Sequence, residues 1–495
     1  MIDAAIEALG NVIQPVNLTF MLLGITIGLI IGILPGLGGT VGMALVIPFL
    51  YGMDPYAGVA LMIGLLAVTQ TSDTFPSVLF GIPGTAASQA TIMDGYPLAK
   101  QGHARRALSA AFISSMFGGI IGGITLFLTI PIIRPLILSF GSPELFMLTL
   151  FGITIIGMVA GRKPIQGILM GIVGLLVGTI GAAPAAPEYR FTFDWLYLYD
   201  GISIIILVLA FFAIPEMVEL LSSKRKISNT GKLEGSSFQG IRDVFNNKWL
   251  VIRSSSIGAF IGAIPGLGGS IIDWIAYFLA KKTVKNSEGF GKGDIRGVIA
   301  PESATNSKEG GQLISTLLFS IPGSTSMAVL LGGLILMGIE TGPSMVSDNL
   351  PITMSIIWTL IIANIFATGV SFFIAKPVSL LTTIDPNKFV PFLLVIISVG
   401  AYQATRSWVD LLLLLAFGFI GWIMKEINWS RIPFIIGVVL AVPSERYFFI
   451  SIERYGLDWL TRPVVIIIGI IIILTIIGSP LVSYIKNQRN KRVKI

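Results

Sequence analysis

The stretch Ile31-Gly-Ile-Leu-Pro-Gly-Leu-Gly-Gly-Thr40 recurs later in the chain as Ile261-Gly-Ala-Ile-Pro-Gly-Leu-Gly-Gly-Ser270, with seven of ten positions identical. A second pair follows in the same order, because Leu79-Phe-Gly-Ile-Pro-Gly-Thr85 returns as Leu318-Phe-Ser-Ile-Pro-Gly-Ser324 with five of seven positions identical. A single Pro-Gly in an apolar stretch is common in membrane helices. Two ordered pairs indicate an internal duplication instead.

Composition indicates whether this duplicated chain folds in water or in a lipid bilayer. Of its 495 residues, 54% are hydrophobic and only 12% are charged, and the mean hydropathy is +0.86. A soluble domain carries roughly 25% charged residues. The charges occur in short stretches between apolar runs long enough to cross a bilayer. The sequence therefore predicts an all-α integral membrane protein.

Loop charge indicates how the two halves are oriented. In the first half, loop 51–56 after the first motif has no Lys or Arg, whereas loop 94–106 after the second motif has three. The pattern is reversed in the second half, where loop 281–296 is basic and loop 339–351 is not. Basic loops are retained in the cytoplasm. Equivalent loops should then face opposite sides, as in transporters built from inverted-topology repeats.

The same charges predict what each motif does to the chain. Segment 254–280 has basic stretches on both sides and should enter the membrane and turn back, while segment 18–50 should do the same from outside. The second motifs should break the spans 57–93 and 297–338. We therefore expect two inverted repeats with re-entrant hairpins, broken transmembrane helices and about 11 crossings.

These expectations divide the chain into four parts. They are a first transmembrane repeat at 1–223, a cytoplasmic linker at 224–253, a second inverted transmembrane repeat at 254–430, and C-terminal transmembrane helices with a basic cytoplasmic tail at 431–495.

The second motifs are candidates for a substrate site. Pro-Gly ends one half-helix, and Thr85 and Ser324 are suited to cap the next one. A helix N-terminus inside the membrane presents free N–H groups to an anion such as a carboxylate. An ordinary structural kink is the alternative, which the duplication disfavours. The predicted substrate-binding residues are Pro83, Gly84, Thr85, Ser88, Pro322, Gly323, Ser324, Thr325 and Ser326.

Asp73 is the candidate for a coupling-cation site. It stands among hydroxyl residues in Thr69-Gln-Thr-Ser-Asp-Thr74, directly before the first break, and ionisable groups at membrane depth often mark ion pathways. Hydroxyl, carboxylate and carbonyl oxygens are the donors that a hard cation accepts. An interfacial position or a Lys partner is the alternative. The predicted cation-site residues are Gly36, Gly38, Gly39, Thr69, Ser72, Asp73, Gly266, Gly268, Gly269 and Asn306.

Other charged residues carry weaker expectations. Glu302, Lys308 and Glu309 belong to a stretch that is expected to lie partly in the cytoplasmic loop. Asp273 either serves the hairpin or simply caps a helix. The first 17 residues have no Lys or Arg, so we expect no signal peptide.

Several function classes lack their sequence signals. The chain has no cysteine, no phosphate-binding Walker motif and no Gly-x-Ser-x-Gly elbow. We expect neither an enzyme nor a bound cofactor. The net charge of +7 lies in loops beside apolar spans and does not indicate nucleic-acid binding.

From about residue 20 to 450 the chain resembles the large membrane subunit of the tripartite tricarboxylate transporters, the TctA family. The residues that carry the resemblance are Pro35-Gly-Leu-Gly38, Ile82-Pro-Gly-Thr85, Asp94-Gly-Tyr-Pro-Leu-Ala-Lys-Gln-Gly102, Gly262-Ala-Ile-Pro-Gly266, Phe290-Gly-Lys-Gly293, Ala300-Pro-Glu302, Ile321-Pro-Gly323 and Gly338-Ile-Glu-Thr-Gly-Pro343. The resemblance implies a multi-pass permease of the bacterial inner membrane that imports di- or tricarboxylates by symport, with Na+ as the expected coupling ion.

The resemblance also implies partners: a small membrane subunit (TctB-like), a periplasmic solute-binding protein (TctC-like), a small carboxylate substrate and membrane lipid. A homodimer is one option for the oligomeric state, which stays open. A stand-alone dicarboxylate carrier, coupled to Na+ or H+ and working without a binding protein, is the alternative function.

Overall fold

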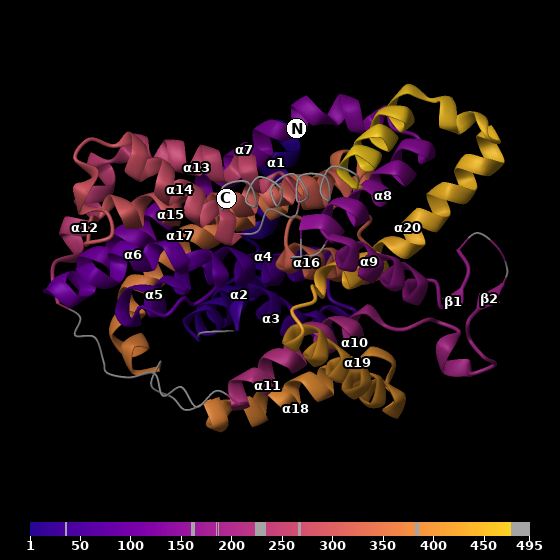
Figure 1. The fold of residues 1–495 in the computed structure, drawn as a ribbon, viewed down its shortest axis with the longest axis horizontal. Coiled ribbons are helices and arrows are strands. Elements are labelled where there is room, and N and C mark those ends of the chain that lie inside the picture. The colour runs from indigo at the N-terminus through magenta and orange to yellow at the C-terminus, as the bar shows by residue number, and fades with distance from the viewer. Residues whose placement is uncertain are drawn as a thin grey trace, which may run out of the picture.

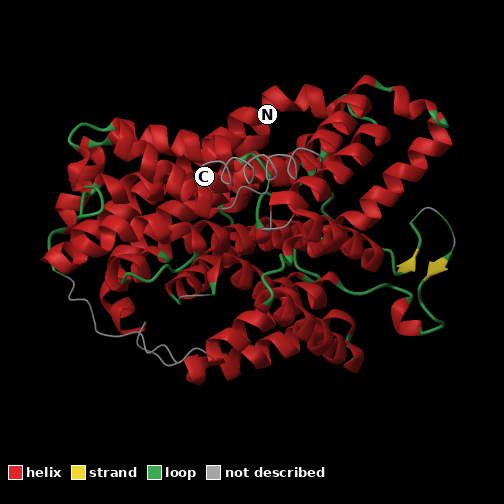
Figure 2. Cartoon of the chain, viewed as in Figure 1, coloured by secondary structure: helices red, strands yellow, loops and turns green. Residues whose placement is uncertain are grey.

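The computed structural model describes residues 1–34, 37–159, 164–184, 186, 188–222, 234–265, 269–381 and 386–476. Within these residues the chain is almost entirely helical, as Figure 2 shows. The described strands are β1 (Gly181–Ala182) and β2 (Tyr189–Arg190), which pair antiparallel with Gly181 opposite Arg190. The predicted all-α class is confirmed.

The helices follow one another along both halves of the chain (Figure 1). The first half contains α1 (Ile2–Val12), α2 (Pro15–Ile33), α3 (Gly38–Val46), η1 (Ile47–Leu50), α4 (Pro55–Ser72), α5 (Thr74–Phe80), η2 (Ala86–Ser88), α6 (Gln89–Leu98), η3 (Ala99–His103), α7 (Ala104–Leu138), α8 (Ser142–Val159), α9 (Pro164–Gly178), η4 (Leu196–Leu198), α10 (Ile204–Val208), η5 (Leu209–Ala213) and α11 (Ile214–Ser222). The second half contains α12 (Ser237–Asn246), α13 (Lys248–Gly262), α14 (Gly269–Thr283), η6 (Ser287–Gly289), α15 (Arg296–Leu313), η7 (Ile314–Leu318), α16 (Thr325–Leu336), η8 (Pro343–Val346), α17 (Leu350–Leu381), α18 (Pro386–Thr405), α19 (Trp408–Glu426), α20 (Ile432–Tyr455) and η9 (Asp458–Thr461).

Seven helical stretches in the described part of the chain are long and apolar enough to cross a membrane. They are Pro15–Ile33, Pro55–Phe80, Gln89–Leu138, Ile204–Ser222, Leu350–Ala375, Trp408–Glu426 and Ile432–Tyr455. Shorter apolar helices accompany them, among them Thr325–Leu336 and Pro463–Ile476. The chain is thus a multi-pass membrane protein, and the number of about 11 crossings stays a prediction.

In each half, the helix before the first motif packs closely on the helix that leads to the second motif. α2 crosses α4 so closely that a Cβ added at Gly28 would lie 2.6 Å from the carbonyl oxygen of Leu65. α13 crosses α15 in the same manner, because a Cβ at Gly258 would lie 2.2 Å from the carbonyl oxygen of Ala304. Small residues let membrane helices approach this closely. The two central helices, α4 and α15, are buried almost throughout.

The helices around this centre form groups at the periphery of Figure 1. α8, α9 and α20 pack together on the right, and α11, α18 and α19 pack together at the bottom. α7 packs on α15 of the other half, and α17 packs on α4. The linker expected at 224–253 differs from the structure in its later part, which forms α12 and the start of α13. α12 is amphipathic and packs on α7, and Arg106 of α7 pairs with Asp243.

The loops that follow the motifs meet in pairs. Gln101 Nε2 donates to the carbonyl oxygen of Lys292 at 2.9 Å, and the N–H of Gly291 donates to Asp94 at 2.8 Å, which joins loops 94–106 and 281–296. Gly58, just after loop 51–56, lies against Met337, just before loop 339–351. Basic loops therefore meet basic loops, and loops without basic residues meet each other. Inverted repeats predict this pairing, and which end is cytoplasmic stays a prediction.

We predict that cysteines at His103 and Lys292 are labelled from the cytoplasmic side, and that a cysteine at Tyr51 is labelled from the opposite side. All three side chains are exposed, and the chain has no native cysteine to interfere. The measurement is labelling by a membrane-impermeant maleimide in right-side-out and inverted vesicles. Labelling of His103→Cys and Lys292→Cys from opposite sides would contradict the inverted arrangement.

Candidate substrate cavity

The two second motifs form breaks with the same backbone geometry. The first half-helix ends at a left-handed residue in each case, Gly81 with φ +66° and Ser320 with φ +57°. The next helix begins after a hydroxyl cap, since Thr85 accepts from the N–H of Ala87 at 3.1 Å and Ser324 accepts from the N–H of Met327 at 3.4 Å. The predicted caps are therefore confirmed. Each cap leaves other first-turn N–H groups without an acceptor inside its helix.

A hydroxyl in the preceding half-helix supports each break in the same way. Ser77 donates to the carbonyl oxygen of Asp73 at 2.9 Å and accepts from the N–H of Gly84 at 3.4 Å. Thr316 donates to the carbonyl oxygen of Gln312 at 2.7 Å and accepts from the N–H of Gly323 at 3.3 Å. These bonds satisfy backbone groups that the breaks remove from the helix ladder.

Both breaks line one cavity of about 630 Å³. Its wall contains eight of the nine predicted substrate residues, namely Pro83, Gly84, Thr85, Pro322, Gly323, Ser324, Thr325 and Ser326. The starts of α3 and α14 complete this side of the cavity with Gly38, Gly39, Thr40 and Gly269. The hydroxyls of Thr40 and Ser326, which come from different halves, lie 3.1 Å apart. Residues from the peripheral helices also line the cavity, among them Phe212, Glu216, Arg431 and Ile432.

Ser88 is the predicted substrate residue that does not line this cavity. It is buried, and its hydroxyl accepts from the N–H of Thr85 at 3.3 Å and lies 2.9 Å from the hydroxyl of Ser77. These bonds complete a capping box with Thr85. The sequence pattern that suggested a ligand is therefore used locally, to hold the first break in shape.

Asp73 lies directly behind the first break. Its side chain is 1% exposed, and its Oδ2 accepts from the hydroxyl of Thr85, which lines the cavity. Gly84 fits against it so tightly that an added Cβ would lie 2.6 Å from the Asp73 Cβ. Asp73 is thus linked to the cavity through Thr85.

The described members of the predicted cation site have other hydrogen-bond partners, and a cation site there stays a prediction. Thr69 donates to the carbonyl oxygen of Leu65 in its own helix, and Ser72 donates to that of Gly28 in α2, so backbone carbonyls engage both hydroxyls. Asn306 donates to Ser115 and Asn364 in a separate buried network. Gly38, Gly39 and Gly269 line the cavity, whereas Gly36, Gly266 and Gly268 lie outside the described residues.

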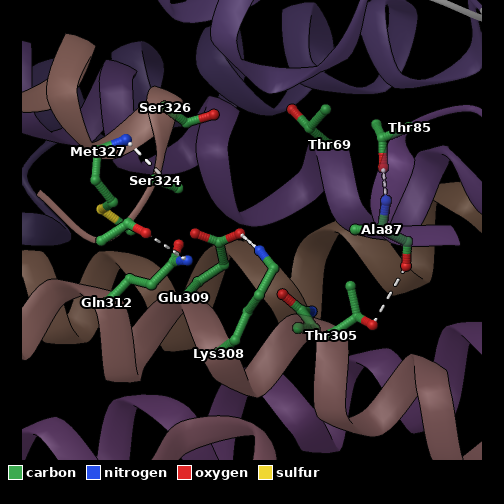
Figure 3. A network of polar contacts seen from close by, with 12 residues as sticks. Thr69, Thr85, Ala87, Thr305, Lys308, Glu309, Gln312, Ser324, Ser326 and Met327 are labelled. Carbon is green, nitrogen blue, oxygen red and sulfur yellow. Dashed lines mark hydrogen bonds and ion pairs between the residues drawn. The ribbon is translucent and has the colours of Figure 1, made fainter. Parts of the chain in front are cut away.

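Two charged residues of the cavity were placed elsewhere by the sequence analysis. Lys308 and Glu309 were expected partly in a cytoplasmic loop, but the structure places them in α15, 3% and 1% exposed, in the cavity wall. They form an ion pair with each other, as Figure 3 shows. The expectation was wrong because α15 is polar in sequence yet buried by α7 and α13.

Two further carboxylates lie behind the cavity wall. Glu302 is 3% exposed and accepts from Thr74 at 3.0 Å and from Thr91 at 2.8 Å. Asp273 is fully buried and accepts from the N–H of Ala90 at 2.6 Å, so it caps α6 rather than its own hairpin. Lys308 and Glu309 are buried in the same region of the chain, on the helix that also carries Glu302. Such a concentration of charge at membrane depth usually marks a transport pathway.

The comparisons with known proteins agree with this architecture. Residues 18–436 match the family described as the tripartite tricarboxylate transporter TctA family. An uncharacterised 52.8 kDa protein from the TAR-I ttuC′ 3′ region of Agrobacterium vitis is 27% identical over 446 residues, which cover 88% of this chain and 87% of that protein. A second uncharacterised protein, from the TAR-II ttuC′ 3′ region of Agrobacterium vitis, is 27% identical over 190 residues, covering 38% of this chain and 78% of that protein. No solved structure matches the chain. Because the family match spans most of its length, the chain belongs to the tripartite tricarboxylate transporter TctA family and is the membrane component of such a transporter.

Proposed function

We propose that this chain is the permease subunit of a binding-protein-dependent secondary transporter, which imports di- or tricarboxylates by symport with Na+. Its setting is the bacterial inner membrane, with the C-terminus in the cytoplasm. Its partners are a small membrane subunit and a periplasmic solute-binding protein. The observation that carries the proposal is the single cavity lined by both duplicated breaks.

The cavity offers a carboxylate several kinds of donor. Thr85, Ser324 and Ser326 bring hydroxyls to it, and the first turn of α16 brings N–H groups at the positive end of the helix dipole. Lys308 and Arg431 bring positive charge from different parts of the chain. Helix starts and basic side chains are the donors that bind anions in proteins. Two basic groups in one cavity suit a substrate with more than one carboxylate.

Asp73 provides the binding site for the coupling ion. A carboxylate buried behind the wall of an anion site repels the anion unless a cation lies between them. The hydroxyl of Thr85 already connects Asp73 to the cavity. A sodium ion near Asp73, with hydroxyl and carbonyl oxygens as further ligands, removes that repulsion and links its own entry to substrate entry.

We predict that proteoliposomes containing this chain and its small membrane subunit take up a di- or tricarboxylate only with the binding protein present and an inward Na+ gradient. The measurement is uptake of radiolabelled succinate and citrate with Na+ replaced by choline, and with the binding protein omitted. Empty liposomes are the control. Equal uptake without the binding protein would instead show a stand-alone carrier, and no gradient-dependent uptake of either probe would contradict the proposal.

A further inference from the structure

The two breaks have equivalent shapes but different charged residues beside them. When the second motifs are superposed in sequence, Thr69 and Gln70 of α4 correspond to Lys308 and Glu309 of α15, and Asp73 corresponds to Gln312. Ser77 and Thr316, which make equivalent hydrogen bonds to the carbonyl oxygens of Asp73 and Gln312, also correspond in this alignment. The glycines agree as well. A Cβ on Gly39 would lie 3.6 Å from Thr69, and a Cβ on Gly269 would lie 2.6 Å from Lys308. The first half therefore carries a lone acid, and the second half carries an ion pair.

That ion pair does not serve the packing of the fold. Lys308 and Glu309 are adjacent residues of one helix, so their bond joins no two elements. Adjacent helical residues do not normally face each other, yet both side chains reach the cavity and meet there. Burying two charges has a desolvation penalty that their attraction offsets only with good additional partners. A structural purpose does not account for the pair.

Glu309 and Gln312 present two acceptor oxygens that lack donors. Glu309 Oε1 accepts from Lys308, while Glu309 Oε2 is buried and has no hydrogen-bond partner among the described residues. Gln312 is fully buried, and its Oε1 has none there either. The Nε2 of Gln312 donates to the carbonyl oxygen of Gly323 at 3.3 Å, and this bond fixes the orientation of the amide. Figure 3 shows the carboxylate of Glu309 between the Lys308 ammonium and the Gln312 amide. Glu309 and Gln312 are three residues apart on α15 and so share one face of the helix. Two neighbouring acceptors without a donor suit a cation.

We propose that a substrate carboxylate displaces Glu309 from Lys308, and that Glu309 and Gln312 then bind a sodium ion. The proposal rests on the proposed function and adds the substrate's charged anchor and a cation site distinct from Asp73. The substrate carboxylate takes the place of the Glu309 carboxylate on the Lys308 ammonium. Lys308 therefore keeps an ion pair. The released Glu309 would be a buried carboxylate without a counter-ion, so substrate binding requires a cation.

Arg431 is less suited to be the exchanging cation. Its guanidinium donates to the carbonyl oxygen of Phe211 at 2.8 Å and to Glu216 at 3.4 Å. Glu216 also pairs with Lys425. These contacts tie η5, α11, α19 and α20 together, so releasing Arg431 would loosen the peripheral wall. The bond between Lys308 and Glu309 can open without moving a helix.

The test measures carboxylate binding to the purified transporter at several Na+ concentrations, at fixed pH, with the probe that the wild type takes up best. We expect the wild type to bind the probe at least tenfold more tightly at saturating Na+ than without it. In Glu309→Gln the competitor for Lys308 loses its charge, so binding without Na+ should become at least tenfold tighter. The number of Na+ ions bound together with the probe, given by the slope of its affinity against Na+ concentration, should fall by about one. The exposed variant Glu340→Gln is the control and should behave like the wild type.

Two further variants separate the roles within the site. Gln312→Met removes one cation ligand and keeps the ion pair, so it should raise the half-saturating Na+ concentration about tenfold without changing probe affinity at saturating Na+. Lys308→Gln should weaken probe binding at least 100-fold at every Na+ concentration. If Glu309→Gln keeps the Na+ dependence of the wild type, the exchange is refuted, while Na+-driven uptake by the wild type still supports the proposed function. If the wild type shows no Na+-dependent uptake, the proposed function itself fails.

Discussion

Replacing Gly84 by valine is expected to reduce carboxylate uptake by up to about 100-fold while the protein still inserts into the membrane. A Cβ at this position would lie 2.6 Å from the Asp73 Cβ and 2.7 Å from its Cα and carbonyl oxygen. Two of these three atoms belong to the backbone at the start of α5, so no side-chain rotation relieves the clash. The break must move instead, and Thr85 moves with it. Overpacking of this kind costs about 1–3 kcal/mol, and 2.7 kcal/mol is a factor of about 100.

The equivalent change in the second half should have a smaller effect. A Cβ at Gly323 would lie 2.8 and 3.0 Å from the Cγ and Cβ of Gln312, which are side-chain atoms with more freedom to yield. The measurement is initial uptake in proteoliposomes, normalised to the amount of inserted protein. Gly369→Val is the matched control, because nothing lies within 4 Å of a Cβ at Gly369. Wild-type uptake by both Gly84→Val and Gly323→Val would show that the breaks are ordinary kinks.

The sequence predicted the breaks well because the signals there are local. Pro-Gly removes hydrogen bonds from a helix, and a following hydroxyl caps the next turn, whatever packs around them. Thr85 and Ser324 accordingly occupy their predicted cap positions. The meeting of the two breaks at one cavity depends on the duplication, which identity between the motifs revealed.

The residues that the sequence misplaced depend on tertiary packing. α15 has a polar sequence, and no apolar periodicity marks it as a central helix. It is buried because glycines of α7 and α13 let their backbones cover it closely, as at Gly122 and Gly258. Aligning the two halves through their second motifs would have revealed Lys308, because it corresponds to Thr69 in a predicted span. For hydroxyl residues such as Ser72 the sequence leaves two uses open, since a serine can bond a neighbouring backbone as readily as an ion.

Asp73→Asn is expected to strongly reduce Na+-driven accumulation of carboxylate while leaving substrate exchange across the membrane possible. The variant keeps the shape of the side chain and an acceptor for Thr85, but it removes the negative charge. Two like charges about 4 Å apart repel by about 4 kcal/mol at an effective dielectric constant of about 20, so the wild-type carboxylate opposes an anion in the cavity unless a cation is bound. Without that charge the substrate no longer needs sodium at this site, and one of the ions that couple its entry to the sodium gradient is lost.

The measurement varies sodium and pH independently, and it compares accumulation with counterflow, which needs no gradient. Reduced sodium-dependent accumulation with counterflow retained supports a sodium site at Asp73. Loss of pH dependence with sodium dependence intact would show that a proton, rather than sodium, neutralises Asp73. Accumulation and counterflow like those of the wild type under both gradients would make Asp73 a structural residue. In the binding assay, the double variant Asp73→Asn with Glu309→Gln extends the comparison, because two independent cation sites predict that each single variant keeps only part of the sodium dependence and that the double variant loses all of it.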